Sequence, residues 1–283
     1  MFTLHNGDCL TVLPSIPSGS IDAIITDLPY GTTACKWDTV IEFAPMWKEV
    51  KRVLKPSGAF ITTASQPFTS ALIMSDPKYF KQELIWDKVC ATGALLAYKR
   101  IMKVHENIVL FYAKQCTFNP QYTPRKKEDL RPNKKQTKLN NPCKSGDVTS
   151  HKVNKHSEKY DDTRVNPKSI IAVNKRSGVY FHATQKPVAL YEYLIKTYTN
   201  EGETVLDIAM GSGTTIEAAE RTGRNSIGIE KDEGIFQSAV LRLKSFTPSN
   251  NRLHLTGGES GQQSLFSAGD TLPAKLPAKS PRR

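Results

Sequence analysis

The sequence has few features of secreted or membrane proteins. Its five cysteines are scattered over 283 residues and include no Cys-x-x-Cys pair. An odd set of dispersed cysteines is typical of a reducing compartment. No apolar run approaches the ~20 residues that span a bilayer, and residues 1–8 lack the basic and apolar segments of a signal peptide. We therefore expect a cytoplasmic protein without membrane contact.

Metal ligands are equally sparse. Cys143, His151 and His156 lie close together in the sequence, but in a polar segment that supplies no fourth partner. Structural zinc sites use four ligands. We therefore expect no metal site.

Positive charge is concentrated in two segments. The formal net charge is +12 at pH 7. Residues 124–168 hold 13 Lys and Arg against 6 Asp and Glu, and residues 242–283 hold 7 against 2. The excess therefore lies beside a neutral scaffold, which favours a polyanionic partner. The alternative is an ordinary solvated surface.

Short apolar segments alternate with helical patterns over most of the chain. Segments of strand length occur at 21–26, 59–63, 80–86, 105–112, 204–208 and 226–230, and an ordered pattern returns around 170–173. Apolar residues spaced by three and four favour helices over 47–54, from a capping Thr184 to 198, over 214–222, and up to about Lys244. This alternation predicts an α/β fold with a doubly wound, mainly parallel sheet.

The pattern is interrupted once and ends before the chain does. From Pro124 to Lys168 large apolar residues become sparse, while Lys, Asn, Pro and Thr dominate. This composition predicts an insert that leaves the core or orders on a partner. From 247 onward, the Gly, Pro, Lys and Ser content predicts a disordered tail. We therefore divide the chain into 1–114, 115–168, 169–246 and 247–283.

A glycine loop follows the strand at 204–208. Gly211 and Gly213 stand just before a helix that begins near Thr214. Such a loop lets a ligand approach the backbone, and the helix N-terminus offers free N–H groups. Glu230 ends the next strand, where it can accept hydrogen bonds from two ribose hydroxyls. The pattern favours a nucleoside-containing cofactor. The alternative is a turn that only joins strand to helix, and position 216 is Ile, so the dinucleotide fingerprint is absent.

A second candidate site follows the strand at 21–26. Asp27-Leu28-Pro29-Tyr30 stands at the end of a buried strand, where ligands bind in open α/β sheets. The amino nitrogen of adenine is a poor nucleophile because its lone pair is delocalised into the ring. The carboxylate of Asp27 and the carbonyl of Leu28 can hold both amino hydrogens, and the ring of Tyr30 can stack on an extruded base. The alternative is a structural turn.

The order of these motifs is itself informative. The catalytic motif comes first, the basic segment second and the glycine loop last. In this order, the chain resembles the permuted, β-class amino-methyltransferases of bacterial restriction–modification systems, solitary methylases and phages. The resemblance covers about residues 3–114 and 170–242. It rests on Asn6-Gly7-Asp8-Cys9-Leu10, Asp22, Asp27–Tyr30, Lys36-Trp37-Asp38, Val53–Gly58, His105-Glu106-Asn107, Thr184–Pro187 and Asp207–Thr215.

This resemblance implies a fold, a reaction and a partner. It implies a Rossmann-like methyltransferase fold that transfers a methyl group from S-adenosylmethionine to N6 of an adenine flipped out of double-stranded DNA. Residues 1–114 would form the catalytic half, 115–168 a basic target-recognition insert and 169–246 the cofactor-binding half. The host would be a bacterial cell or a phage-infected one.

The resemblance also implies roles for single residues. Asp27, Leu28, Pro29 and Tyr30 would bind the target base, and Glu230 would hold the cofactor ribose. Asp8 would contact the cofactor's adenine, and Gly211 and Gly213 would pass under its methionine part. Lys186 and Thr214 or Thr215 would meet its carboxylate, and Asp207 and Ala209 complete the expected cofactor site.

Two positions depart from the family pattern. Leu28 stands where the family usually has Pro, which removes a conformational lock on φ but keeps the carbonyl. Ile208-Ala209 stands where the family usually has Pro-Phe, so an aromatic contact to the cofactor is missing.

Other functions remain open at this point. An N4-cytosine methyltransferase would use similar parts, although Asp at position 27, where Ser is the alternative, favours adenine. A structured-RNA or protein-amide methyltransferase faces the same chemical problem, but the basic segments favour nucleic acid. A non-catalytic DNA-binding protein could retain the fold. The recognition sequence, a partner nuclease and the oligomeric state, including a homodimer, stay open.

Overall fold

A nine-stranded sheet forms the centre of the protein. In this computed structural model the described residues are 1–33, 35, 38–125, 163–175, 185–246 and 253–256. Within them the strand order is β11-β1-β10-β9-β2-β3-β5-β4-β8. These strands are β1 (Phe2–Asn6), β2 (Ile21–Thr26), β3 (Leu54–Ala64), β4 (Phe80–Thr92), β5 (Lys103–Phe111), β8 (Ile170–Ala172), β9 (Thr204–Asp207), β10 (Asn225–Glu230) and β11 (Leu253–Thr256).

The sheet is mainly parallel. Neighbouring strands from β11 to β3 run parallel, β5 pairs antiparallel with both β3 and β4, and β8 pairs parallel with β4. Its strand segments are rich in Ile, Val and Leu because both faces are covered. The predicted doubly wound, mainly parallel α/β fold is confirmed.

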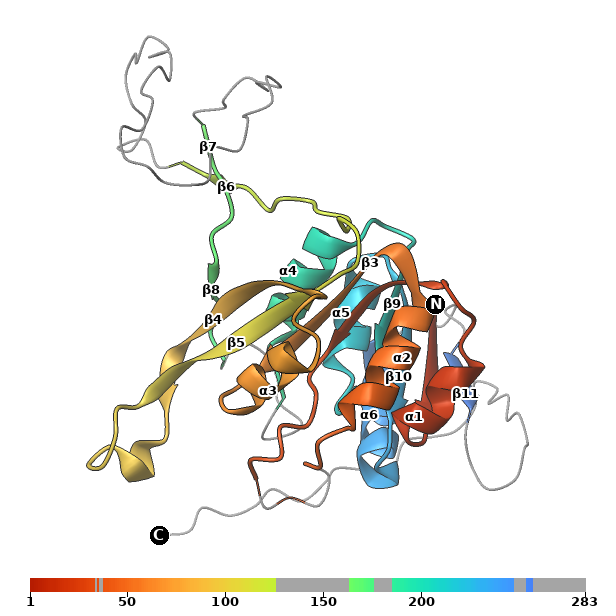
Figure 1. Ribbon diagram of the computed structural model, residues 1–283, viewed down its shortest axis with the longest axis horizontal. Coiled ribbons are helices and arrows are strands. Elements are labelled where there is room, and N and C mark those ends of the chain that lie inside the picture. The colour runs from red at the N-terminus through yellow and green to blue at the C-terminus, as the bar shows by residue number, and fades with distance from the viewer. Residues whose placement is uncertain (34, 36–37, 126–162, 176–184, 247–252, 257–283) are drawn as a thin grey trace.

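Helices cover both faces, as alternate side chains of the strands require. Ile24 and Phe60 belong to a core cluster that includes residues of α1 (Cys9–Val12), α2 (Phe43–Val53) and α3 (Phe68–Ser75). Their sequence neighbours Ile25 and Ile61 belong to a second cluster, with α4 (Val188–Tyr198) and α5 (Thr214–Arg221). Helix α6 (Glu233–Phe246) packs with α5 and β1 in a third cluster. Figure 1 shows the two helical layers on either side of the sheet.

The strand order reverses between β2 and β9. The connection from β2 runs through α2 to β3, and the connection from β9 runs through α5 to β10 on the opposite face. Such a reversal leaves a crevice at the carboxyl ends of the two strands. Asp27 follows β2 and Asp207 ends β9, so the crevice lies between the two predicted motifs.

Most predicted elements are present with shifted ends. Helix α2 ends at Val53, and β3 begins at Leu54, so Pro56–Gly58, which separates the predicted helix at 47–54 from the predicted strand at 59–63, lies inside a strand. The N-cap of α4 is Pro187, and Thr184, the predicted cap, lies outside the described residues. The predicted strands at 80–86 and 105–112 form the antiparallel hairpin β4–β5, which also contains the short 3₁₀ helix η2 (Ala94–Leu96).

Other elements were not predicted. They include strand β1, helices α1 and α3 and the 3₁₀ helix η1 (Leu13–Ser15). Strand β11 corrects the prediction of a structureless tail, because Leu253–Thr256 pairs in parallel with β1. Four residues carry little periodic signal, and the partner strand lies about 250 positions away, at Phe2–His5.

Two short strands connect the main sheet to the insert. Strands β6 (Thr123–Pro124) and β7 (Arg164–Val165) pair antiparallel, and they project from the main sheet in Figure 1. The residues from 126 to 162, with most of the predicted basic insert and the three candidate metal ligands, lie outside the described residues. Among the described residues, no helix has the length and apolar character that crossing a membrane requires.

Candidate active site

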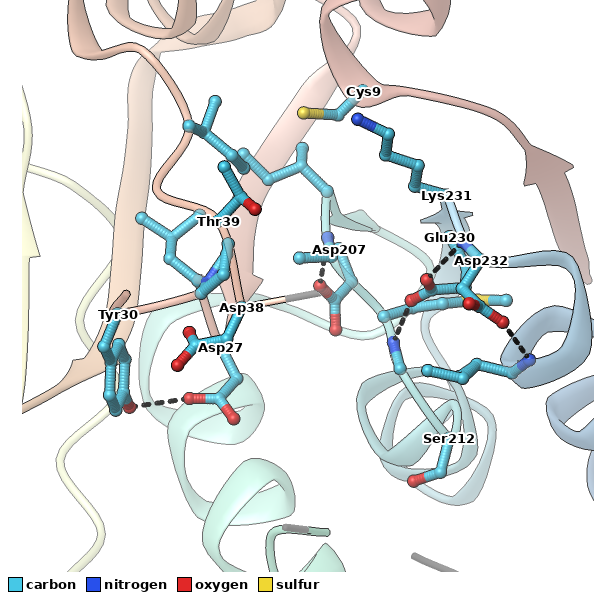
Figure 2. Close-up of a pocket in the computed structure, with 18 of the residues that line it drawn as sticks. Cys9, Asp27, Tyr30, Asp38, Thr39, Asp207, Ser212, Glu230, Lys231 and Asp232 are labelled. Carbon is cyan, nitrogen blue, oxygen red and sulfur yellow. Dashed lines mark hydrogen bonds between the residues drawn. The ribbon is translucent and has the colours of Figure 1, made fainter. Parts of the chain in front are cut away.

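One pocket contains nearly the whole predicted site. It measures about 940 Å³ and lies at the carboxyl ends of β1, β2, β9 and β10. Every predicted site residue except Gly213 lines it. In Figure 2 Asp27 and Tyr30 lie on one side and Glu230 and Ser212 on the other, with Asp207 between them. The fold therefore joins two motifs that are 180 residues apart, Asp27 and Asp207.

The two glycines of the loop have different surroundings. Gly211 has a φ of +52°, and a Cβ added to it would meet no atom within 4 Å. Gly213 has a φ of +78°, and its added Cβ would stand 3.0 Å from Leu243 Cδ1 in α6. Both need the left-handed backbone that glycine tolerates. Gly211 leaves space free beside the loop, whereas Gly213 lets α6 approach it.

Asp207 holds the loop through its carboxylate. Its Oδ1 accepts hydrogen bonds from Thr26 Oγ1 at 2.7 Å and from the Ala209 N–H at 3.1 Å. Its Oδ2 accepts a hydrogen bond from Thr215 Oγ1. Burial raises the pKa of Asp207 to about 6, although these three donors favour the ionised form. The side chain thus ties β2, the loop and the start of α5 together.

A buried ion pair supports the loop from the other side. Arg242 of α6 donates to the Ser212 carbonyl at 2.6 Å and to the Glu217 carboxylate. Glu217 also pairs with Arg221 at 2.5 Å. Burial lowers the pKa of Arg242. In the sequence Arg242 opens the basic segment 242–283, but in the fold it is buried, as are Ala239 and Leu243 of the same helix. Its spacing from the apolar residues of the helix is the only sequence signal that could have shown that Arg242 is buried.

Glu230 faces the glycine loop. Its Oε2 accepts a hydrogen bond from the Gly211 N–H at 2.9 Å, and its Oε1 accepts one from the Asp232 N–H at 2.8 Å. Burial raises the pKa of Glu230. Each carboxylate oxygen has a second lone pair, so both can still accept a hydroxyl group.

Asp8 stands beside Glu230 at the start of α1. Its Oδ1 caps the helix through the Leu10 N–H at 2.9 Å, and its Oδ2 pairs with Lys231 at 3.0 Å. Burial alone would raise the pKa of Asp8, but the hydrogen bonds from Lys231 and Leu10 and the charge of Lys231 together outweigh it and lower the pKa. Lys231 is 77% exposed, so this pair adds little stability.

On the other side, Asp27 receives three side-chain donors. Its Oδ1 accepts hydrogen bonds from Tyr30 Oη at 2.7 Å and from Thr63 Oγ1. Its Oδ2 accepts Lys186 Nζ at 2.6 Å. The ring of Tyr30 stacks on Phe68, with 5.3 Å between the ring centroids. The carboxylate and the aromatic ring of the predicted base site are therefore fixed relative to each other.

Leu28 is buried at 2% exposure and packs with the core cluster that includes α1, α2 and α3. Burial of the apolar side chain stabilises the folded state, and this offsets the loss of the fixed φ that a proline would supply at this position.

Asp38 fixes the loop after Tyr30. Its carboxylate accepts hydrogen bonds from the N–H groups of Gly31, Thr32 and Thr33 at 2.7–2.9 Å and from the Thr33 hydroxyl. Burial would raise the pKa of Asp38, but these donors outweigh it and lower the pKa. In the sequence Asp38 is part of a family motif without an assigned role, and these backbone contacts give it a structural one.

Lys186 lies between two carboxylates. Besides Asp27, its Nζ faces Glu106 Oε2 of β5 at 3.4 Å. The resemblance implied a contact with the cofactor's carboxylate, whereas in this structure the ammonium group is paired with the base site. Glu106 was part of a family motif in the sequence but had no predicted role.

Comparison with known proteins identifies the family. The family model described as DNA methylase, which covers N6 and N4 methyltransferases, matches residues 21–241. The chain belongs to this DNA methylase family. The type II methyltransferase M.HinfI of Haemophilus influenzae is 27% identical over 280 residues, covering 89% of this chain and 71% of that protein. M.HpaI of Haemophilus parainfluenzae is 29% identical over 260 residues, covering 84% and 73%.

Solved structures support the fold. The crystal structure of the M1.HpyAVI complex with S-adenosylmethionine matches with a TM-score of 0.57 and 24% identity, covering 86% of this chain and 99% of that one. The cytosine-N4-specific PvuII DNA methyltransferase matches with a TM-score of 0.59 and 17% identity, covering 89% and 90%. Both similarities extend over almost the whole length of each structure.

Proposed function

We propose that this DNA methylase transfers a methyl group from S-adenosylmethionine to N6 of adenine in DNA. The observation that carries the proposal is the single pocket shared by Asp27, Tyr30, the Gly211 loop and Glu230. A carboxylate beside an aromatic ring suits an exocyclic amino group, and a glycine loop with an acidic strand end suits a nucleoside.

The residues of the loop side fit S-adenosylmethionine. The free space beside Gly211 suits the close approach of a ligand to the backbone. Glu230 has acceptor capacity left for two ribose hydroxyls, and Asp8 stands beside it at the pocket wall. The helix N-terminus at Thr214 offers N–H groups and a positive dipole end to a carboxylate. When bound there, the cofactor supplies an electrophilic methyl group on a sulfonium.

The residues of the Asp27 side orient the acceptor. The Asp27 carboxylate and the Leu28 carbonyl accept the two amino hydrogens and favour a tetrahedral nitrogen. The amino lone pair forms the new N–C bond while the C–S bond breaks and its electron pair returns to sulfur. The nitrogen then loses one proton towards Asp27. Positioning supplies much of the rate, because no covalent intermediate with the protein forms.

Cytosine N4 is the second candidate acceptor. The PvuII methyltransferase is cytosine-N4-specific and matches the same fold, and an exocyclic amino group on either base suits Asp27. Asp at position 27, where Ser is the alternative, favours adenine.

We expect the hairpin β4–β5 to contact DNA. Its tip exposes Leu95, Tyr98 and Ile101 at 90%, 78% and 97%. Residues 95–103 contain three Lys and Arg and no Asp or Glu. Apolar side chains among cations suit a phosphate backbone and its exposed bases. Replacing Lys99 and Arg100 by Gln should flatten the plot of log K against log salt by ~0.9 for each phosphate that is no longer neutralised.

The decisive experiment incubates the purified protein with unmodified DNA and labelled S-adenosylmethionine. Nucleosides are then analysed by mass spectrometry, and modified positions are mapped at single-nucleotide resolution. N6-methyladenine supports the proposal, and N4-methylcytosine assigns the second candidate. Bound cofactor without any transfer would favour a non-catalytic DNA-binding protein.

A further inference from the structure

A buried lysine occupies an apolar position on the strand beside the base site. Leu84, Trp86 and Lys88 alternate along one side of β4 with exposures of 7%, 0% and 3%. Lysine is almost never buried in this way unless it is paired. The pairing of strands does not by itself explain why a charged side chain follows two core residues on the same side of β4.

The hairpin changes its register at this lysine. The pairing of β4 with β5 shifts between Asp87 and Thr92, and Val89 has a φ of +63°. A β-branched residue rarely adopts this conformation. Bulges of this kind redirect a side chain and are common beside functional sites.

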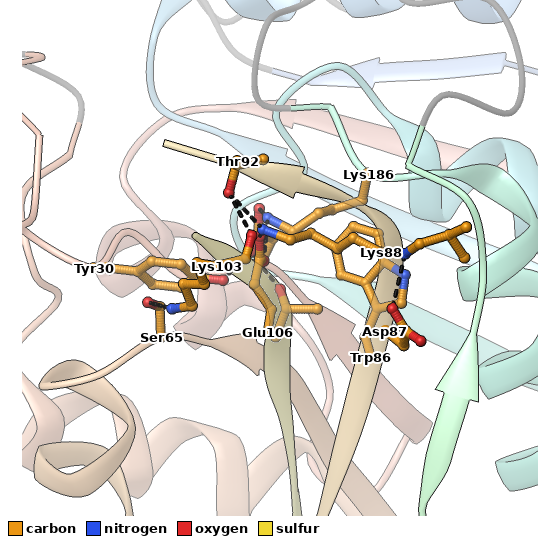
Figure 3. A network of polar contacts seen from close by, with 12 residues as sticks. Tyr30, Ser65, Trp86, Asp87, Lys88, Thr92, Lys103, Glu106 and Lys186 are labelled. Carbon is orange, nitrogen blue, oxygen red and sulfur yellow. Dashed lines mark hydrogen bonds and ion pairs between the residues drawn. The ribbon is translucent and has the colours of Figure 1, made fainter. Parts of the chain in front are cut away.

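Lys88 begins a chain of alternating charges that ends on Asp27. Its Nζ lies 3.4 Å from Glu106 Oε1. The other oxygen of Glu106, Oε2, lies 3.4 Å from Lys186 Nζ, and Lys186 Nζ lies 2.6 Å from Asp27 Oδ2. Figure 3 shows Lys88 and Lys186 converging on Glu106 from two different elements.

This arrangement gives both carboxylate oxygens of Asp27 a donor. Its Oδ1 accepts hydrogen bonds from Tyr30 and Thr63, and its Oδ2 accepts one from Lys186. Oδ2 keeps one lone pair for a target amino group, but the amino group shares that oxygen with the Lys186 ammonium, which is the stronger donor. Displacing a buried ammonium without a new partner is unfavourable. Glu106 already stands next to it.

We propose that Glu106 is a positioning residue that takes over the Lys186 ammonium when the target amino group takes Oδ2 of Asp27, with Lys88 holding Glu106 in place. The proposal rests on the proposed methyl transfer but applies to either acceptor base. It predicts a role in the chemical step and none in cofactor affinity.

Lys186 must stay protonated through this exchange. Burial would lower its pKa, but the carboxylates of Asp27 and Glu106 outweigh burial and raise the pKa above its ordinary value. Cations in this cluster lower the pKa of one another's ammonium groups. Burial and the charges of Lys88 and Lys186 lower the pKa of Lys175. The phenols of Tyr30 and Tyr191 are also close to Asp27 and Glu106, and burial raises the pKa of both.

The test compares single-turnover transfer at saturating DNA and S-adenosylmethionine. Glu106→Gln should slow transfer by roughly tenfold to a hundredfold, with cofactor affinity by calorimetry changed by less than about twofold. The alkaline limb of its pH–rate profile should move to lower pH, because Lys186 loses one carboxylate and keeps the repulsion of Lys88. Glu83→Gln is the matched control, since Glu83 also lies on this hairpin but contacts Asn107. This control should behave like the wild type.

A second variant separates positioning from folding. Lys88→Met with Glu106→Gln removes both charges, so no buried ion is left unpaired, and thermal unfolding checks that it folds. Slow transfer by this folded protein supports the proposal, and a wild-type rate or an unmoved alkaline limb in Glu106→Gln overturns it. A wild-type protein that transfers no methyl group would instead refute the proposed function.

Discussion

The two sides of the pocket are held in different ways. On the loop side, Asp207 accepts only neutral donors, from Thr26, Thr215 and the Ala209 backbone. Arg242 and Glu217 fix the same loop from behind, away from the pocket lining. On the base side, the reactive carboxylate of Asp27 itself takes part in an ion pair, with Lys186.

This difference separates a preformed site from one that must exchange partners. The loop side can receive a ligand without breaking its supporting bonds, which lowers the cost of binding. On the base side, the amino group shares Asp27 Oδ2 with a charged donor, Lys186, unless that donor moves to another partner. Substitutions on the loop side should therefore change stability and cofactor affinity, and substitutions on the base side should change the chemical step.

The largest effect is expected from Asp27→Ala. Loss of the carboxylate that orients the amino group should lower the single-turnover rate by roughly 10²–10⁴-fold. Cofactor affinity should stay close to the wild-type value, because Asp27 belongs to the base side. Titration calorimetry and a radiolabel transfer assay would measure the two quantities. Equal losses in both would place Asp27 in the cofactor site.

Arg242→Met should affect folding first. It leaves Glu217 buried without its closest cation, which typically costs about 3–5 kcal/mol. Urea denaturation should show this loss in the free energy of unfolding, followed by weaker cofactor binding as the Ser212 carbonyl loses its donor. Arg221→Met is the control, because Arg221 is half exposed on the same carboxylate and should cost much less. Equal losses of stability in the two variants would mean that burial of the arginine does not decide how strongly it stabilises Glu217.

Asp207 should make stability depend on pH. Its pKa in the folded protein is raised to about 6 from 3.8, so the folded state binds more protons than the unfolded state between these values. Stability should therefore be highest below about pH 4 with respect to this group and fall by roughly 3 kcal/mol as pH rises to 6. Denaturation of the wild type and Asp207→Asn across this range would isolate the contribution. A wild-type profile in the variant would assign the dependence to another group.

The two loop glycines should separate binding from packing. Gly211→Ala meets no neighbouring atom, so it should cost only about 1 kcal/mol of backbone strain while weakening S-adenosylmethionine binding by about tenfold as its methyl enters the free space. Gly213→Ala places a methyl group 3.0 Å from Leu243 and should cost about 1–3 kcal/mol of stability. Calorimetry and thermal unfolding of both variants would test this. A reversed order would show that Gly213 is the residue beside the ligand.

The amino-acid sequence by itself determined the fold class and the family. The apolar segments of β2, β9 and β10 and the helical spacing of α2, α4 and α5 are local patterns, and each records which side of the element is buried. The turn residues and the acidic strand ends likewise belong to continuous motifs. Asp27–Tyr30 and the Gly211 loop could therefore be assigned without coordinates.

Only the tertiary structure decided which charges meet. Arg242 was counted as surface charge, and its pairing with Glu217 depends on how α6 packs against α5. Lys88, Glu106 and Lys186 come from β4, β5 and the start of α4, and a bulge in a hairpin brings the first two towards Asp27. Likewise, β11 pairs with a strand at the opposite end of the sequence. Local periodicity records burial, whereas ion pairs between distant elements depend on packing and register, which no short segment encodes.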